Sequence, residues 1–425
     1  MLGAPVFRTA LFGPWSGNAL WTAARAVPSL DLCFADKKDL ICASSGRQLV
    51  TFARASSGTY TDSAGVLQTA ATDVPRFDHN PLTGESLGLL VEEQRTNLLL
   101  RSEEFDDAYW SKTLSSVSAN STNSPASTQT ADTLVEDTSN GEHQITRFFT
   151  LTSGTIYTVS IYVKAAGRTF CRFGFTGTGF SGPTRSTFNL ATGAVTMNNG
   201  GSPTITPVGS GWYRLSVTNT ATSTTSGSFI IQPQLDASTL SYTGDGTSGI
   251  FLWGAQLEAG AFASSYIPTT TAAATRSASL ADLISSAIAN NIRSFYVEFS
   301  SPAVGTRGAA SLNDNTANKR IEVITSGTDP RLVVRDGGVE QANINGGTVT
   351  AGVKTRVAVR ISANDFAISI NGSTAATDTS GTLPTVDRLM IGRTQAGEYL
   401  NGGIARFAGW TELLSDVTLQ SLSQP

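Results

Sequence analysis

The sequence is poor in the residues on which most active sites depend. Of its 425 residues only two are histidines, His79 and His143, and three are cysteines. Charged residues make up 15% of the chain, and its 29 Lys and Arg residues do not outnumber the 33 Asp and Glu residues. Histidine-based metal sites and Ser/His catalysis need more histidine, and nucleic-acid binding needs a concentrated basic patch. The composition therefore disfavours all three classes of function.

Long apolar runs are also absent. No segment reaches the roughly 20 apolar residues that cross a bilayer, and the N-terminus lacks the regions of a signal peptide. We therefore expect no membrane insertion and a chain made in a reducing cytoplasm with free, buried thiols. A disulfide between Cys33 and Cys42 stays open as an alternative, because a hairpin through the polar turn at 36–39 would bring the two sulfurs together.

The chain is rich in material for strands and turns. It has 41 glycines and many Ser and Thr residues, interspersed with β-branched and aromatic residues. Apolar and polar side chains alternate over residues 156–164 and 295–299, which is typical of half-buried strands. Asn371-Gly372 is typical of a hairpin turn. The polar run 115–130 is expected to be a surface loop, and the segment 411–422 to close with a helical turn.

These patterns predict an all-β protein with two tandem β-sandwiches of the jelly-roll, lectin-like kind, preceded by an extended N-terminal arm and a small β connector. The predicted segments are an arm at 1–28, a connector at 29–96, a jelly roll at 97–268, a linker at 269–290 and a second sandwich at 291–425.

The arm carries large apolar side chains that need a surface to cover them. Phe12, Trp15 and Trp21 are therefore candidates for docking onto a neighbouring subunit. Packing of the arm on the body of its own chain is an equally weighted alternative.

A series of distinctive blocks runs through residues 29–268. The blocks are FARASSGTYTD at 52–62, VPRFD at 74–78, EEQRTNLL at 92–99, YTVSIYVK at 157–164, GWYR at 211–214, GDGTSGI at 244–250, WGAQLE at 253–258 and YIP at 266–268. Together they resemble a module of tailed-bacteriophage virion proteins of the tail-fibre, collar and head-binding types, which is similar to carbohydrate-binding-module jelly rolls. More loosely, ISING at 368–372 and GGIAR at 402–406 are similar to laminin-G/concanavalin A-like domains.

The resemblance implies a structural virion component, assembled in the cytoplasm of the host bacterium and displaying lectin-like sandwiches for attachment to host-surface polysaccharide. The implied partners are other virion proteins and copies of the same chain, with a trimer as the default. Two alternatives stay open: a head or neck decoration protein without a ligand, and a polysaccharide depolymerase. Depolymerisation needs two carboxylates about 5–10 Å apart. Glu298 and Glu322 each stand alone on their predicted strands, so we expect no enzyme activity.

Sugar rings stack on exposed aromatic side chains, so the candidate glycan-binding residues are aromatics outside the core and their polar neighbours. In the second sandwich they are Tyr399 with Arg393, Gln395, Glu398 and Asn401, and in the first sandwich Tyr109 and Trp110. Trp212 and Trp253 are expected in the core.

No cofactor and no metal site are predicted. Asp245 and Asp314 are weak calcium candidates, because each lies in a turn rich in oxygen ligands. A turn role, in which the carboxylate bonds its own backbone, is favoured for both.

Overall fold

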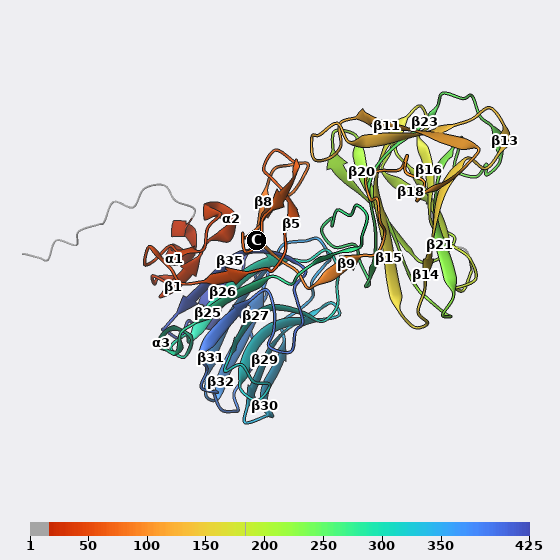
Figure 1. The fold of residues 1–425 in the computed structure, drawn as a ribbon. Helices are drawn as coiled ribbons and strands as arrows, with labels where there is room; N and C mark the ends of the chain where they lie inside the picture. The colour runs from red at the N-terminus through yellow and green to blue at the C-terminus, as the bar shows by residue number, and fades with distance from the viewer. Residues whose placement is uncertain (1–16, 183) are drawn as a thin grey trace, which may run out of the picture. The chain divides into compact units, whose positions relative to one another are not determined.

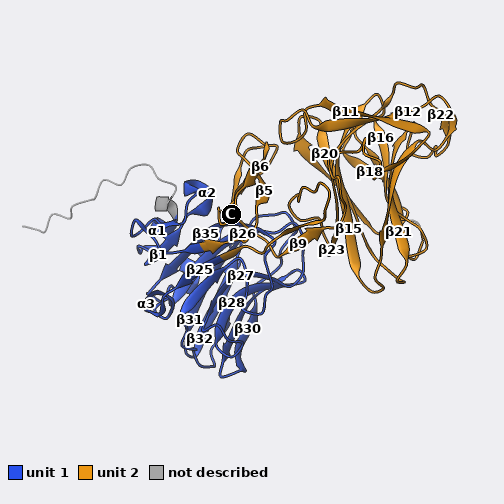
Figure 2. Ribbon diagram, in the orientation of Figure 1, with its two compact units in different colours: residues 1–51, 281–425 blue, residues 52–280 orange. Residues whose placement is uncertain are grey.

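The computed structural model describes residues 17–182 and 184–425, and the docking candidates Phe12 and Trp15 lie outside them. Strands dominate these residues, with four short helices (Figure 1). None of the described helices has the length and apolar character needed to cross a membrane. The chain forms two compact units, one of residues 1–51 and 281–425 and the other of residues 52–280 (Figure 2). The all-β prediction is confirmed.

The first unit, containing residues 281–425, is a sandwich of two antiparallel sheets. One sheet has the order β3 (Arg47–Gln48), β2 (Ile41–Cys42), β1 (Leu30–Leu32), β35 (Gly402–Trp410), β26 (Ser294–Ser300), β31 (Thr355–Ser362), β32 (Asp365–Ile370) and β33 (Ala376–Asp378). The other runs through β30 (Val339–Asn345), β29 (Asp329–Asp336), β28 (Arg320–Ser326), β27 (Arg307–Asn313), β34 (Arg388–Ile391) and β25 (Leu280–Ile284).

Helices cover the outer face of the first of these sheets. α1 (Gly17–Ala24) and α4 (Asp416–Leu422) place Ala24, Leu419 and Leu422 in one apolar cluster with Tyr296 and Trp410 of the sheet. The predicted C-terminal helical turn is therefore confirmed. Two further short helices, α2 (Phe34–Lys37) and α3 (Ser286–Ala289), belong to the same unit.

The N-terminal segment is part of this sandwich. β1 pairs with β35, with Asp31 opposite Ala408, and the Asp31 carboxylate accepts hydrogen bonds of 2.9 and 2.7 Å from Arg406. The predicted boundaries therefore need correction. Residues 29–51 belong with the C-terminal sandwich instead of a connector, because the edge of β35 needs a backbone partner and Arg406 needs a counter-charge. The predicted linker 269–290 likewise contains β25 and α3.

Trp21 packs on its own chain. Its side chain is half-buried, and its indole N–H donates a 2.8 Å hydrogen bond to the Asp31 carboxylate. The alternative of packing on the body of the chain therefore holds for Trp21, and its docking onto a neighbouring subunit stays a prediction. A tryptophan N–H that leaves water needs an acceptor, and the first strand supplies one.

The second unit is a jelly-roll sandwich of two six-stranded sheets. One has the order β10 (Ser111–Thr113), β14 (Gln144–Thr150), β21 (Ser226–Gln234), β16 (Phe170–Thr176), β17 (Thr184–Asn189) and β18 (Ala194–Met197). The other has the order β11 (Ser115–Thr122), β12 (Ala131–Glu136), β23 (Gly249–Ala259), β15 (Ile156–Ala166), β20 (Trp212–Thr220) and β19 (Ser202–Gly209). Aromatic and aliphatic side chains from both sheets fill the space between them.

Three sequence predictions can be compared directly with this unit. The strand predicted at 156–164 is confirmed within β15. The surface loop predicted at 115–130 is wrong for residues 115–122, which form the edge strand β11. An edge strand with most of its side chains toward solvent buries little apolar surface, so its sequence carries no apolar alternation. Trp212 and Trp253 are buried as expected, in a cluster with Tyr162 and Tyr266.

A buried ionic cluster ties the start of this unit to its end. The Glu92 carboxylate lies 2.7 Å from the Arg76 guanidinium and 3.3 Å from that of Arg276. It also accepts hydrogen bonds of 2.8 and 2.7 Å from the backbone N–H and hydroxyl of Ser265. The block VPRFD supplies Arg76, the block EEQRTNLL supplies Glu92, and Ser265 directly precedes the block YIP. These three blocks of the resemblance therefore have a structural role.

All three cysteines are free and buried, so the alternative of a Cys33–Cys42 disulfide is wrong. Burial raises the pKa of the Cys33 thiol to about 12. We expect alkylation by iodoacetamide to modify Cys33 only after unfolding, because the thiolate is the reactive form. Intact mass after alkylation in denaturant without reductant should show three modified thiols. A single modified thiol would establish a disulfide.

Candidate functional site

A groove of about 260 Å³ lies on the first unit, over β28, β29 and β30. We call it the β28–β30 groove. Its lining combines charged, amide and aliphatic side chains: Arg320, Glu322, Ile324, Ser326, Arg331, Val333, Arg335, Glu340, Asn343 and Glu398.

The period of the strands puts these side chains on one face of the sheet. Ile321 and Val323 of β28, with Leu332 of β29, are almost completely buried in the core. Their neighbours in sequence, Glu322 and Val333, therefore point to the opposite face. The pairing register places Glu322 beside Val333. It also places Val333 beside Asn343 of β30, which lines the groove as well. A rigid sheet thus holds the lining in fixed rows.

Charges of both signs alternate across the groove. Arg320 lies 3.3 Å from the Glu322 carboxylate, and Arg335 lies 3.6 Å from that of Glu340. Arg331 donates a 3.0 Å hydrogen bond to the side-chain oxygen of Asn343. Within the described residues, the buried Nε atoms of Arg331 and Arg335 have no hydrogen-bond partner. Both guanidinium groups thus keep unused donor capacity.

Besides Glu340, two carboxylates that are distant from each other in the sequence line this groove. Glu322 is 3% exposed and accepts a 3.0 Å hydrogen bond from the Ser311 hydroxyl. Burial raises the pKa of Glu322 above its usual range despite the opposing effects of Arg320 and Ser311, and the charge of Glu398 acts in the same direction as burial. Glu398 comes from the loop after β34. The sequence does not predict this pair, because nothing local in the sequence connects a strand residue with a distant loop.

The loop that contains the predicted sugar-binding residues is held in place by its own side chains. The Arg393 guanidinium bonds both oxygens of the Asp282 carboxylate at 2.7 Å. Asn401 is 3% exposed, and its side-chain amide donates a 3.2 Å hydrogen bond to the carbonyl of Tyr399. Both residues therefore shape the loop. Asn401 is too buried to contact a sugar, which corrects its assignment, whereas the role of Arg393 in sugar binding stays a prediction.

The remaining loop candidates have different surroundings. Glu398 lines the groove, where its carboxylate accepts a hydrogen bond from the Thr394 hydroxyl, and its role in sugar binding stays a prediction. The Gln395 amide donates a 3.4 Å hydrogen bond to the carbonyl of Asn315, and the backbone of Tyr399 forms a bridge with Arg393. Both side chains are half-buried, and their role in sugar binding stays a prediction.

The aromatic candidates of the jelly roll are wholly or partly covered by side chains of their own unit. Trp110 is 1% exposed, with ring-centroid distances of 5.0 Å to Phe105 and 5.5 Å to Phe229. The Arg147 guanidinium covers one face of Tyr109 at 3.6 Å from the ring centroid. The predicted binding role is therefore wrong for Trp110, which fills the core, and one ring face of Tyr109 is already occupied.

The calcium candidates serve as turn residues. The backbone N–H and hydroxyl of Ser248, followed by those of Thr247, bond the Asp245 carboxylate and hold its pKa well below the usual range. Asp314 accepts equivalent bonds from Thr316. The described part of the chain contains no group of three or more His, Cys, Asp or Glu side chains placed to hold a metal.

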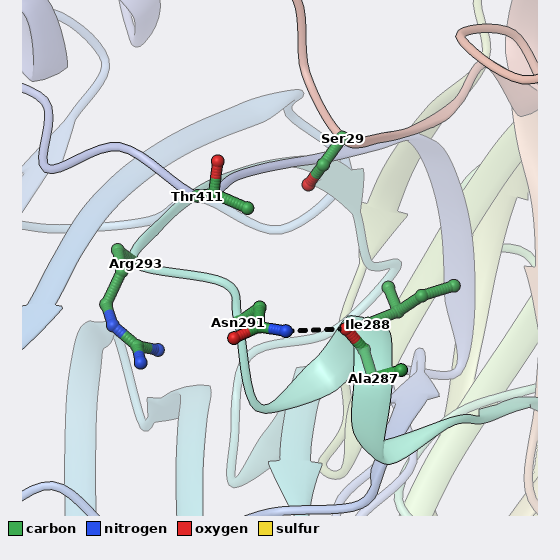
Figure 3. Close-up of a pocket in the computed structure, with 6 residues that line it drawn as sticks. All are labelled: Ser29, Ala287, Ile288, Asn291, Arg293 and Thr411. Carbon is green, nitrogen blue, oxygen red and sulfur yellow. Dashed lines mark hydrogen bonds between the residues drawn. The ribbon is translucent and has the colours of Figure 1, made fainter.

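A second pocket, of about 250 Å³, lies beside α3 (Figure 3). Its polar side chains already bond the backbone around them: Asn291 bonds the Ala287 carbonyl at 2.8 Å, Arg293 that of Asn290 at 2.7 Å, and Ser29 that of Gly409 at 3.1 Å. This pocket has no carboxylate in its lining and its polar side chains are already bonded, so it offers a ligand fewer polar partners than the β28–β30 groove does.

No protein-family model and no curated protein matches the chain. Among solved structures, domain 4 of AbnA, a GH43 extracellular arabinanase from Geobacillus stearothermophilus, in complex with arabinotriose, is 16% identical, with a TM-score of 0.29 over 38% of this chain and 82% of that chain. Domains LG4-5 of the mouse laminin α1 chain are 9% identical, with a TM-score of 0.24 over 64% and 89%. The N-terminal CBM22-1-CBM22-2 tandem domain of Paenibacillus barcinonensis Xyn10C is 11% identical, with a TM-score of 0.24 over 75% and 98%. Matches with TM-scores this low say nothing about the function of this chain, so only the chain's own residues support the candidate site.

Proposed function

We propose that the protein is a non-enzymatic glycan-binding component of a bacteriophage virion, and that the β28–β30 groove binds host-surface polysaccharide. The observation that carries the binding proposal is the lining of the groove. Arginine, amide and carboxylate groups there supply donors and acceptors for hydroxyl groups, and Ile324 and Val333 supply apolar contact for the C–H faces of sugar rings. The virion assignment is supported by the sequence blocks within residues 52–268.

The arrangement favours weak, repeated binding. The groove is small and open, so one chain offers contact for only a short stretch of glycan. Copies of the chain around a symmetry axis would bind a polymeric glycan with much higher avidity than one copy. The proposal therefore includes a homo-oligomer, with a trimer as the expected state, attached to other virion proteins.

Replacement of a groove arginine tests the proposal. We expect Arg331→Ala to weaken binding to the host polysaccharide about 10- to 100-fold, the effect of losing one charge-assisted hydrogen bond. The measurement is retention of the full chain on immobilised capsular polysaccharide, or on lipopolysaccharide, from the host of the phage. Arg356→Ala is the matched control, because Arg356 is similarly exposed but lies on β31 of the other sheet. Equal retention of both variants and the parent chain would contradict a binding role for the groove.

Polysaccharide hydrolysis is the second candidate, favoured by one observation. Glycoside cleavage uses a pair of carboxylates, one of which has a raised pKa and donates the proton. Glu322 and Glu398 line the same groove, and burial raises the pKa of Glu322. Release of reducing ends from the bound polysaccharide, abolished by Glu322→Gln, would replace the non-enzymatic proposal. Retention of the chain on the polysaccharide without release of reducing ends supports the non-enzymatic proposal.

The location and the decoration alternative need a separate measurement. Mass spectrometry of purified particles should find the chain among the virion proteins. If the chain is present in particles and the parent protein binds none of the host glycans, the decoration alternative replaces the binding proposal.

A further inference from the structure

The outer face of one jelly-roll sheet carries a row of polar side chains that the proposed function does not use. Cys171, Phe173 and Ile231 belong to the core, so their neighbours Arg172 and Gln232 point to the opposite face of β16 and β21. Register sets Arg172 beside Thr187 on one side and beside Gln232 on the other. Gln232 in turn donates a 3.1 Å hydrogen bond to the Gln144 side chain of β14. The row thus crosses four strands.

Two members of this row are buried with unsatisfied polar atoms. Arg172 is 4% exposed, and its Nε and Nη1 have no hydrogen-bond partner within the described residues. Gln232 is fully buried, and its Oε1 also has none, although its amide nitrogen donates to Glu142 at 2.7 Å. A buried charge or polar group without a partner costs free energy, so such groups in folded proteins normally have one. Here the chain does not supply it.

The charge around Arg172 is positive. Arg185 lies in the next row of the same face, opposite Gly174 of β16. Burial lowers the pKa of Arg172, and the charge of Arg185 lowers it further, while Glu142 acts in the opposite direction. Glu142 lies 3.8 Å from Arg185, and Arg172 makes no ion pair within the described residues. Glu142 thus pairs with Arg185, and the Arg172 charge has no carboxylate partner among the described residues, so an added anion can pair with it.

An exposed aromatic ring lies on the same face. Ile145 of β14 is a core residue and Phe149 packs against the same core, so Phe148 between them points outward, and it is 61% exposed. Phe148 lies four residues along β14 from Gln144, which is about 14 Å at the usual rise of a strand. That separation exceeds the size of a single small anion and fits a short chain of sugar rings.

We propose that this face is a second glycan-binding site, in which Arg172 and Arg185 bind the carboxylate of an acidic sugar and Phe148 stacks on another ring of the same oligosaccharide. A guanidinium pairs with a carboxylate through two parallel hydrogen bonds, which suits the free donors of Arg172. The Gln232 side chain bonds a sugar hydroxyl beside the carboxylate. The expected ligand class is an oligosaccharide that contains uronic acid.

The test measures binding of two probes to the full chain by calorimetry, oligogalacturonate and a neutral galacto-oligosaccharide of the same length. We expect oligogalacturonate to bind at least tenfold more tightly than the neutral probe. Arg172→Met and Arg185→Met should each remove most of this preference, and Phe148→Ala should weaken binding of both probes. Arg101→Met, at a partly exposed arginine of the same unit, is the control and should bind as the parent does.

Several results would overturn the inference. They are equal binding of the acidic and neutral probes by the parent chain, unchanged binding by Arg185→Met in a folded protein, and competition by acetate as effective as that by oligogalacturonate. Arg185→Met keeps the test valid if Arg172→Met does not fold, because Arg185 is less buried. Arg331→Ala removes the function proposed for the β28–β30 groove and should leave oligogalacturonate binding unchanged, so failure of one proposal is distinguishable from failure of the other.

Discussion

Residues 281–425 expressed without the N-terminal segment should fail to form a stable sandwich. In the full chain β1 pairs with β35, so its loss leaves unpaired backbone groups along a strand whose residues are all buried. Arg406 loses Asp31, and a buried charge left without its partner costs about 3–5 kcal/mol. Trp410 also loses the carbonyl of Ala26, which accepts its indole N–H at 3.1 Å. Thermal unfolding measures the stability of the fragment, and hydrogen exchange of peptides from residues 281–425 measures the stability of the same region in the full chain.

A point variant tests the same contact without removing a strand. We expect Asp31→Asn in the full chain to destabilise the first unit by about 3 kcal/mol or more, because the Arg406 charge stays buried without a carboxylate. Asp365→Asn is the control: the Asp365 side chain is 44% exposed and Arg360 keeps a second carboxylate, Asp416, so the loss should be about 1 kcal/mol or less. If the fragment unfolds at the same temperature as the first unit of the full chain, the N-terminal segment is not a structural part of that unit.

Glu92→Gln should produce the largest loss of stability in the second unit and should change how that unit responds to acid. Burial alone would raise the pKa of Glu92, but Arg276 and Arg76, together with the two hydrogen bonds from Ser265, lower it to about 2. In the unfolded chain the group has its ordinary pKa of 4.5. The difference corresponds to about 3 kcal/mol of stability at neutral pH.

The sign of the pH effect follows from the lowered pKa. The folded state holds the ionised form, so this stability is present above pH 4.5 and is lost as the pH falls from about 4.5 toward about 2. The parent chain should therefore lose stability steeply over this range, and Glu92→Gln should be less stable at pH 7 but show a flatter dependence on acid. Hydrogen exchange of peptides from residues 52–280 at pH 7 and pH 3 measures both effects, because pH 3 lies well inside the range over which this stability is lost.

Glu104→Gln is the control for the acid experiment. Glu104 also pairs with an arginine of the second unit, Arg101, but its side chain is 43% exposed, so its loss should change stability by about 1 kcal/mol or less. Equal stability of Glu92→Gln and Glu104→Gln at pH 7 would contradict the structural role assigned to the buried cluster.

The candidate site was only partly predictable. The sequence predicts a polar binding loop near the C-terminus, and one residue of that loop, Glu398, lines the β28–β30 groove. No pattern in the sequence indicates Arg331 or Glu322 as partners of that loop, because each has the position of an ordinary outward residue on an alternating strand. Trp110 is predicted to be an exposed ring. Burial of that ring depends on Phe105 and Phe229, the second of which is far away in sequence.

By itself the sequence determined that the protein is all-β, where its central strands run and which catalytic chemistries its composition disfavours. These are local properties: period-two alternation sets which side chains face the core, and composition sets which functional groups exist at all. Only the tertiary structure decided that residues 29–51 complete the C-terminal sandwich, that residues 115–122 form an edge strand, and which carboxylates and guanidinium groups meet. Strand partners and counter-charges come from distant parts of the chain, and no local pattern specifies which edge or which charge will be satisfied by which segment.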